Sequence, residues 1–113
     1  MKARFNRNEG VPNLTRRELL IMEILLDRRT RELYGLELVR ESGSRLKRGT
    51  VYVTLGRLED KGFIESREDN QPNVSGLPRR LYKVTGYGQR VFALLQQVQE
   101  LKRLAPVRLD GVS

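Results

Sequence analysis

The chain has neither cysteine nor histidine among its 113 residues. Without cysteine it forms no disulfides or thiolate metal sites, and without histidine it lacks the commonest zinc ligand and general base. The closest carboxylates, Glu59 and Asp60, are neighbours on a predicted helix and diverge by about 100°, so they do not share a site. We therefore expect no cofactor and no metal, and an enzyme is the least favoured function.

Long apolar runs are missing as well. No stretch approaches the roughly 20 residues of a membrane span, and the N-terminus lacks the apolar core of a signal peptide. We expect no membrane contact and a cytoplasmic protein associated with a bacterial nucleoid. The length fits one domain with a modest core, a size at which oligomerisation often adds stability.

The charge of the chain is strongly basic. Lys and Arg number 22 against 14 Asp and Glu, which gives a net charge of +8 and an isoelectric point near 10.4. Such a balance attracts polyanions, among them DNA, RNA and acidic membrane surfaces.

The most informative stretch runs from Leu46 to Thr85. Its first part, Arg48 to Lys61, has helical periodicity, and Gly62 follows as a C-terminal stop. Three apolar side chains share one face of this helix at spacings i, i+4 and i+7: Val51, Leu55 and Leu58. That face is predicted to be buried.

Two short runs after this helix, Phe63 to Glu68 and Arg79 to Thr85, are rich in β-branched and aromatic residues and predict strands. In the second run Tyr82 and Val84 are expected on one face of the strand. The segment 69–78 between the runs contains Asn, Pro, Ser and Gly, which is typical of an exposed hairpin tip. A helix followed at once by such a hairpin is the outline of a winged helix.

The opposite face of the helix carries small, hydroxylated or cationic side chains. Its outward residues are Gly49, Thr50, Val53, Gly56 and Arg57, with Tyr52 and Thr54 on the flanks. Such a set fits a DNA major groove, and Lys47 and Arg48 lie beside the N–H groups of the first turn, where a phosphate binds well. An ordinary solvated helix explains this face alone about equally well.

Two helices are predicted before this stretch. Thr15 and Glu18 form a capping box, and the residues from Leu19 to Leu26 are apolar except for Glu23. A helix apolar nearly all round is buried on more than one side, so Leu20 and Leu25 are expected at a contact with a second subunit, although an ordinary core is the competing explanation. The second helix is predicted over Tyr34 to Glu41 and is stopped by Gly43, which begins the turn of a helix-turn-helix. Its predicted inward residues are Tyr34, Leu38 and Val39.

The last predicted helix runs from Tyr87 to Leu104 and is followed by Pro106. Apolar residues repeat along it at alternating spacings of three and four, and two more widen the stripe: Val91, Leu94, Val98, Leu101 and Ala105, with Phe92 and Leu95 beside them. This seam is typical of helix pairing, and we expect a homodimer with an interface that includes Val91, Leu94, Leu95, Val98 and Leu101.

The order and spacing of several motifs resemble the PadR-like transcriptional regulators. The matching motifs are Tyr34-Gly35, Gly49-Thr50-Val51-Tyr52, Arg57 to Ser66, and Gly76 to Gly88. The resemblance covers about Leu14 to Gly88, some two thirds of the chain. It implies a winged helix-turn-helix that pairs through its C-terminal helix, often with help from the first. It also implies that Arg79 and Arg80 of the wing bind phosphates and that Tyr52 contacts the DNA backbone.

Two positions depart from the family pattern. Lys47-Arg48 stands where the family commonly has Ser-Pro, so a side-chain cap is lost and phosphate affinity is gained. Gly86 follows Thr85 in place of an acidic or polar helix former, so the last helix is expected to start later than usual. The tryptophans with which some relatives sandwich aromatic effectors are absent, since the chain has no Trp, and a small-molecule effector therefore stays an open question.

These features together predict a mostly helical α+β fold. We expect a flexible basic arm over 1–13, a winged-helix domain with three helices and a two-stranded wing over 14–86, a dimerisation helix over 87–105 and a tail over 106–113. The arm is either a disordered end or a DNA-groove contact. The predicted function is a sequence-specific regulator of transcription, most simply a repressor, that binds double-stranded DNA at a palindromic operator as a homodimer. The alternative is a basic winged-helix module for RNA or the ribosome, and a role in protein interaction only is less favoured.

Overall fold

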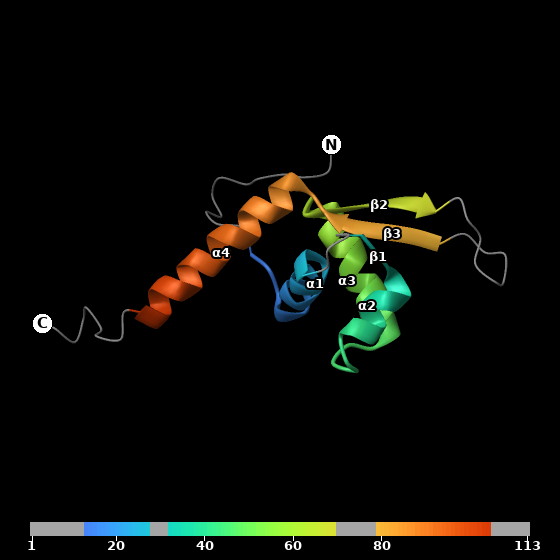
Figure 1. Ribbon diagram of the computed structural model, residues 1–113, viewed down its shortest axis with the longest axis horizontal. Coiled ribbons are helices and arrows are strands. Elements are labelled where there is room, and N and C mark those ends of the chain that lie inside the picture. Colours follow the sequence, from blue (N-terminus) through green and yellow to red (C-terminus); the bar gives the residue numbers. More distant parts are fainter. Residues whose placement is uncertain (1–12, 28–31, 70–78, 105–113) are drawn as a thin grey trace, which may run out of the picture.

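Four helices and three short strands make up the part of the chain that the computed structural model describes, residues 13–27, 32–69 and 79–104 (Figure 1). In chain order they are α1 (Arg16–Asp27), β1 (Leu33–Tyr34), α2 (Gly35–Glu41), α3 (Arg48–Asp60), β2 (Ile64–Asp69), β3 (Arg79–Val84) and α4 (Gly86–Leu104). The predicted N-terminal arm up to residue 12, the hairpin tip from residue 70 and the C-terminal tail lie outside the described residues.

The core lies where α1, α2 and α3 meet the sheet. Figure 1 shows α4 leading away from this cluster on one side, while β2 and β3 extend on the other. The predicted inward residues of α3 are buried, with Val51 and Leu58 at 0% exposure and Leu55 at 1%. No helix in the described ranges is long and apolar enough to cross a membrane.

The start of α1 is held by the predicted capping box and by an ion pair. The Thr15 N–H donates to Glu18 Oε1 at 2.8 Å, and the Glu18 N–H donates to Thr15 Oγ1 at 3.1 Å. Glu18 is 1% exposed, and both of its carboxylate oxygens accept from Lys61 Nζ at 2.8 Å. A buried carboxylate needs such a partner, so this pair ties the beginning of α1 to the end of α3.

Glycines in the left-handed conformation end both helices of the helix-turn-helix. Gly43 has φ +61° after α2, and Gly62 has φ +81° after α3. At the end of α3 the Phe63 N–H donates to the Leu58 carbonyl at 3.0 Å and the Gly62 N–H to the Glu59 carbonyl at 2.9 Å. This is a Schellman motif, which sends the chain directly into the first wing strand.

The sheet has three strands in the order β1-β3-β2, one more than the two-stranded wing that the sequence predicted. β2 and β3 pair antiparallel from Ile64 opposite Val84 to Asp69 opposite Arg79. The additional strand, β1, pairs Leu33 with Tyr82. Two residues are too few to show a period-two pattern, so only the tertiary pairing reveals this strand.

The predicted start of α2 is corrected by the same pairing. Tyr34 lies opposite Leu81 in the sheet, has extended backbone angles and is the N-cap of α2 rather than its first helical residue. Leu38 is fully buried and Val39 packs against the core, as predicted.

The helix α4 begins at Gly86, one residue before the predicted start at Tyr87, so the expected delay is wrong; the residue just before the helix is Thr85. Its hydroxyl accepts from the Gly88 N–H at 2.9 Å and donates to the Gly62 carbonyl at 2.7 Å. A threonine N-cap therefore compensates for the poor helix propensity of glycine. The same side chain fixes the start of α4 on the end of α3.

Candidate nucleic-acid interface

The outward face of α3 is mostly exposed in the described part of the protein. Gly49, Val53, Gly56 and Arg57 are exposed, and Thr50 is half-buried. A Cβ added to Gly49 or Gly56 would meet nothing within 4 Å. A smooth, exposed helix face of this kind permits the close approach that reading base edges in the major groove requires.

The two flanking residues of α3 have different roles. Thr54 is 4% exposed, and its hydroxyl donates to the Thr50 carbonyl at 2.7 Å, so it belongs to the helix interior. Tyr52 is 41% exposed, and its ring lies over Gly35, where an added Cβ would be 2.5 Å from the Tyr52 hydroxyl oxygen. Only glycine at the start of α2 leaves room for the ring in this position.

The first turn of α3 is cationic. Lys47 is the N-cap but makes no side-chain cap hydrogen bond, and the first turn contains no acidic residue. Lys47 and Arg48 are both exposed. The N–H groups of this turn therefore start next to two cationic residues, which favours a phosphate at this end of the helix.

Arg79 and Arg80, the two predicted phosphate ligands of the wing, differ in their surroundings. The Arg79 guanidinium stacks on the Tyr34 ring at 4.2 Å and lies 3.7 Å from Asp69 Oδ2. The Tyr34 hydroxyl also donates to Asp69. This hydrogen bond, followed by partial desolvation, raises the pKa of Tyr34 above its usual value.

Arg80 is the more accessible of the two arginines. It is exposed, and its Nε donates to Ser66 Oγ at 3.1 Å. Arg79 instead helps to hold the base of the wing against the start of α2. Sequence reasoning missed this cluster, because Asp69 was assigned to the hairpin tip and Tyr34 was predicted as the first, inward-facing residue of the second helix.

A cavity of about 580 Å³ is lined by residues of α2, α3 and the wing strand β3. Its lining includes three tyrosines and four arginines: Tyr34, Tyr52, Tyr82, Arg40, Arg48, Arg79 and Arg80. Burial raises the pKa of Tyr82, which is 7% exposed. Cationic and aromatic side chains around an open hollow fit a sugar-phosphate backbone better than a neutral small molecule.

The predicted dimer residues divide into two groups. Leu94 and Leu101 are 41% and 68% exposed, and Leu20, Leu95 and Val98 are half-buried. By contrast Leu25 is 0% and Val91 is 6% exposed. The side chains of Leu25 and Val91 therefore pack inside the protomer. The other five predicted interface residues keep surface that a second copy can reach.

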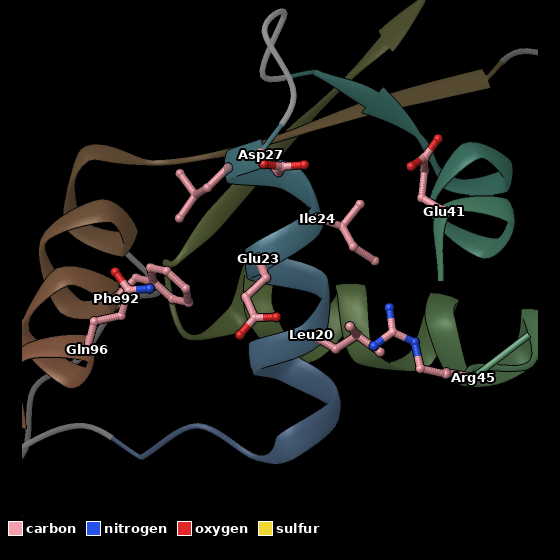
Figure 2. A pocket seen from close by; sticks show the side chains of 9 residues that line it. Leu20, Glu23, Ile24, Asp27, Glu41, Arg45, Phe92 and Gln96 are labelled. Atoms are coloured by element: carbon pink, nitrogen blue, oxygen red, sulfur yellow. The ribbon is translucent and has the colours of Figure 1, made fainter. Parts of the chain in front are cut away.

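A groove of about 510 Å³ runs along α1. Figure 2 shows Phe92 and Gln96 of α4 on one side of α1, and Glu41 and Arg45 on the other. Glu23 and Asp27 contribute carboxylates to its lining. Within the described ranges no group of three or more His, Cys, Asp or Glu side chains is arranged to hold a metal ion.

A helix-turn-helix followed by a β-hairpin that flanks its exposed second helix defines the winged-helix class. Within that class, the model of the transcriptional regulator PadR-like family matches residues 21–94. The chain belongs to this family. Its members are transcriptional regulators rather than enzymes, so this protein is a regulator of transcription that binds DNA.

Individual relatives agree with this assignment. The chain is 38% identical over 85 residues to the transcriptional regulator Rv3488 of Mycobacterium tuberculosis. The aligned region covers 73% of this chain and 75% of the relative. A PadR family transcription regulator from Clostridium difficile R20291 superposes with a TM-score of 0.65 at 28% identity, covering 80% of this chain and 95% of that one. A second, from Eggerthella lenta, has a TM-score of 0.59 at 28% identity, with coverages of 82% and 87%.

Proposed function

We propose that the protein is a repressor that binds a palindromic operator as a homodimer, in the cytoplasm on the bacterial nucleoid. The observation that carries the proposal is the exposed face of α3 together with its cationic first turn and the arginine-lined hollow beside the wing. No single exposed charge would be specific for DNA, but this arrangement offers a groove-reading helix with phosphate ligands beside it.

Each part of this surface has an assigned role in the proposal. Lys47, Arg48 and Arg80 neutralise phosphates and supply much of the affinity, with Arg79 adding charge from the base of the wing. Tyr52 contacts the backbone from its position over Gly35. The base-reading residues are Thr50, Val53 and Arg57, each worth roughly 1–3 kcal/mol of discrimination where the contact is good.

The second copy is proposed to pair through α4. Leu94 and Leu101 are large exposed apolar side chains on this helix, and removing them from water stabilises an interface. Charge adds to this pairing in the proposal: the groove on α1 carries Glu23 and Asp27 beside Arg45, and the last turn of α4 carries Lys102. Arg103, the other cation of that turn, pairs with Glu100 within the protomer. A dimer formed in this way presents two copies of α3 to one duplex, about one helical turn or 34–36 Å apart.

Selection from a random duplex library at two salt concentrations tests the DNA-binding part. The expected result is an enriched inverted repeat whose affinity falls with salt by about 0.9 log units per log unit for each neutralised phosphate. Arg80→Ala should reduce that slope by about one phosphate, whereas the matched control Arg90→Ala, an exposed arginine of α4, should leave it unchanged. Tight binding to structured RNA with no preferred duplex would instead support the RNA-binding alternative.

Sedimentation equilibrium tests the dimer separately. Leu101→Asp places a charge on the proposed interface and should shift the protein toward the monomer at micromolar concentration. Leu36→Asp is the matched control, because Leu36 is also exposed, at 44%, but lies on α2. If both variants, or neither, change the sedimentation, the α4 interface is excluded.

A further inference from the structure

Val53 is an apolar side chain in the middle of the exposed face of α3. It is 56% exposed, whereas the nearby Val51 and Leu55 of the same helix are at most 1% exposed. Val53 therefore contributes little to the core of the protomer. Exposed valines are common on protein surfaces, but this one lies where base edges would approach in the proposed complex.

The surroundings of Val53 make it the most prominent apolar group on that face. Gly49 and Gly56 lie one turn before and one turn after it, and neither has a side chain that would keep DNA at a distance. The hydroxyl of the next residue, Thr54, is turned away to the Thr50 carbonyl at 2.7 Å. The two methyl groups of Val53 are therefore the apolar surface that the middle of this face offers to a base pair.

We propose that Val53 determines specificity by contacting the C5-methyl group of a thymine in each half-site. That methyl is the apolar group that an unmodified base pair presents in the major groove, and valine offers it no hydrogen bond but a matching apolar surface. This inference rests on the proposed function, because it assigns a chemical group of the operator to one residue of the same surface. A 5-methylcytosine carries its methyl at the same place in the groove and shares this chemistry.

The test uses the operator selected from the random library. Each thymine of a half-site is replaced in turn by deoxyuridine, which removes only the methyl group, and affinity is measured by fluorescence anisotropy at constant salt. For the wild-type protein one position per half-site should weaken binding about three- to fivefold, the factor expected for one methyl-sized group in an apolar contact. Val53→Ala, which keeps one methyl group, should reduce this discrimination, and Val53→Ser, which keeps none, should abolish it. Both variants should melt within a few degrees of the wild type, because the side chain is outside the core.

A second arm distinguishes thymine from 5-methylcytosine as the source of the methyl. At the sensitive position a C·G pair and its 5-methylated form are compared, and the methylated form should bind the wild type more tightly by a similar factor. Thymine should bind better than either if it is the natural ligand.

Three results would overturn the inference. The first is a change in affinity of less than twofold for deoxyuridine at every position. The second is a deoxyuridine effect that persists unchanged in Val53→Ala, which would assign the methyl contact to another residue. The third is equal binding of the C·G pair and its methylated form. A library that yields no preferred duplex contradicts the proposed function itself, whereas an enriched operator without a methyl effect at Val53 contradicts only this inference.

Discussion

Replacing Gly88 of α4 by alanine should strongly destabilise the protein. Alanine inside a helix usually stabilises by about 0.5–1 kcal/mol relative to glycine. At Gly88, however, the new Cβ would lie 2.1 Å from the Phe63 carbonyl oxygen and 2.8 Å from Val84 Cγ1. Both neighbours are fixed: the Phe63 carbonyl accepts from the Thr85 N–H at 3.0 Å, and Val84 is buried.

The expected loss of stability in Gly88→Ala follows from the contacts and hydrogen bonds that the added methyl group would disturb. Overpacking of a tight contact costs roughly 1–3 kcal/mol. Displacing α4 also weakens the hydrogen bonds that Thr85 makes with Phe63 and Gly88, at about 1 kcal/mol each. After subtracting the gain in helix propensity, Gly88→Ala should lower the free energy of unfolding by about 2–4 kcal/mol.

Gly56→Ala is the matched control, because Gly56 is also inside a helix but an added Cβ there meets nothing within 4 Å. It should raise the free energy of unfolding by about 0.5–1 kcal/mol. Urea unfolding of both variants, followed by far-ultraviolet circular dichroism at one protein concentration, gives both values. A Gly88→Ala variant as stable as the wild type would refute the packing of α4 on the wing described here.

Three further variants test the surface and its supports. Gly35→Ala should weaken operator binding several-fold in an anisotropy titration with little loss of stability, since its methyl would lie 2.5 Å from the hydroxyl oxygen of the flexible Tyr52 ring. Lys61→Met should lower the free energy of unfolding in urea by about 2–3 kcal/mol, because it leaves the carboxylate of Glu18, which is 1% exposed, without its cation. The loss stays below that of a fully buried pair since the Lys61 side chain is 39% exposed, and a Glu18→Gln/Lys61→Met double mutant should recover part of it. Tyr34→Phe should remove a tyrosine with a raised pKa from the ultraviolet titration curve, as its hydrogen bond to Asp69 disfavours the phenolate, and an unchanged high-pH end of that curve would contradict the assignment.

Local signals were sufficient to predict much of this fold. The capping box at Thr15, the periodicity of α3 and the β-branched runs of the wing each depend on residues close together in sequence. The predicted second wing strand, Arg79 to Thr85, ends one residue beyond the observed strand. The outward face of α3 also followed from the sequence, because burial of three apolar residues fixes the opposite side of a helix.

Features that depend on distant segments were missed or misplaced. The strand β1 exists only through its pairing with β3, and the Tyr34 hydroxyl bonds to Asp69, a residue 35 positions away. The ion pair of Glu18 with Lys61 spans 43 positions. Apolar periodicity also does not say which of two packed helices covers a residue, so Leu25 was expected at the dimer surface although its side chain is fully buried in the protomer.

The most direct test of the account is the mass of the complex with the selected operator, measured by native mass spectrometry or mass photometry. Two protomers should bind one duplex at saturation. Scrambling one half-site should weaken binding by at least an order of magnitude, because each mismatched base pair costs roughly 1–3 kcal/mol and a factor of ten corresponds to about 1.4 kcal/mol. A saturated complex with a single protomer, or equal affinity for the intact and the fully scrambled duplex, would contradict the proposal that two copies of α3 read a twofold-symmetric site.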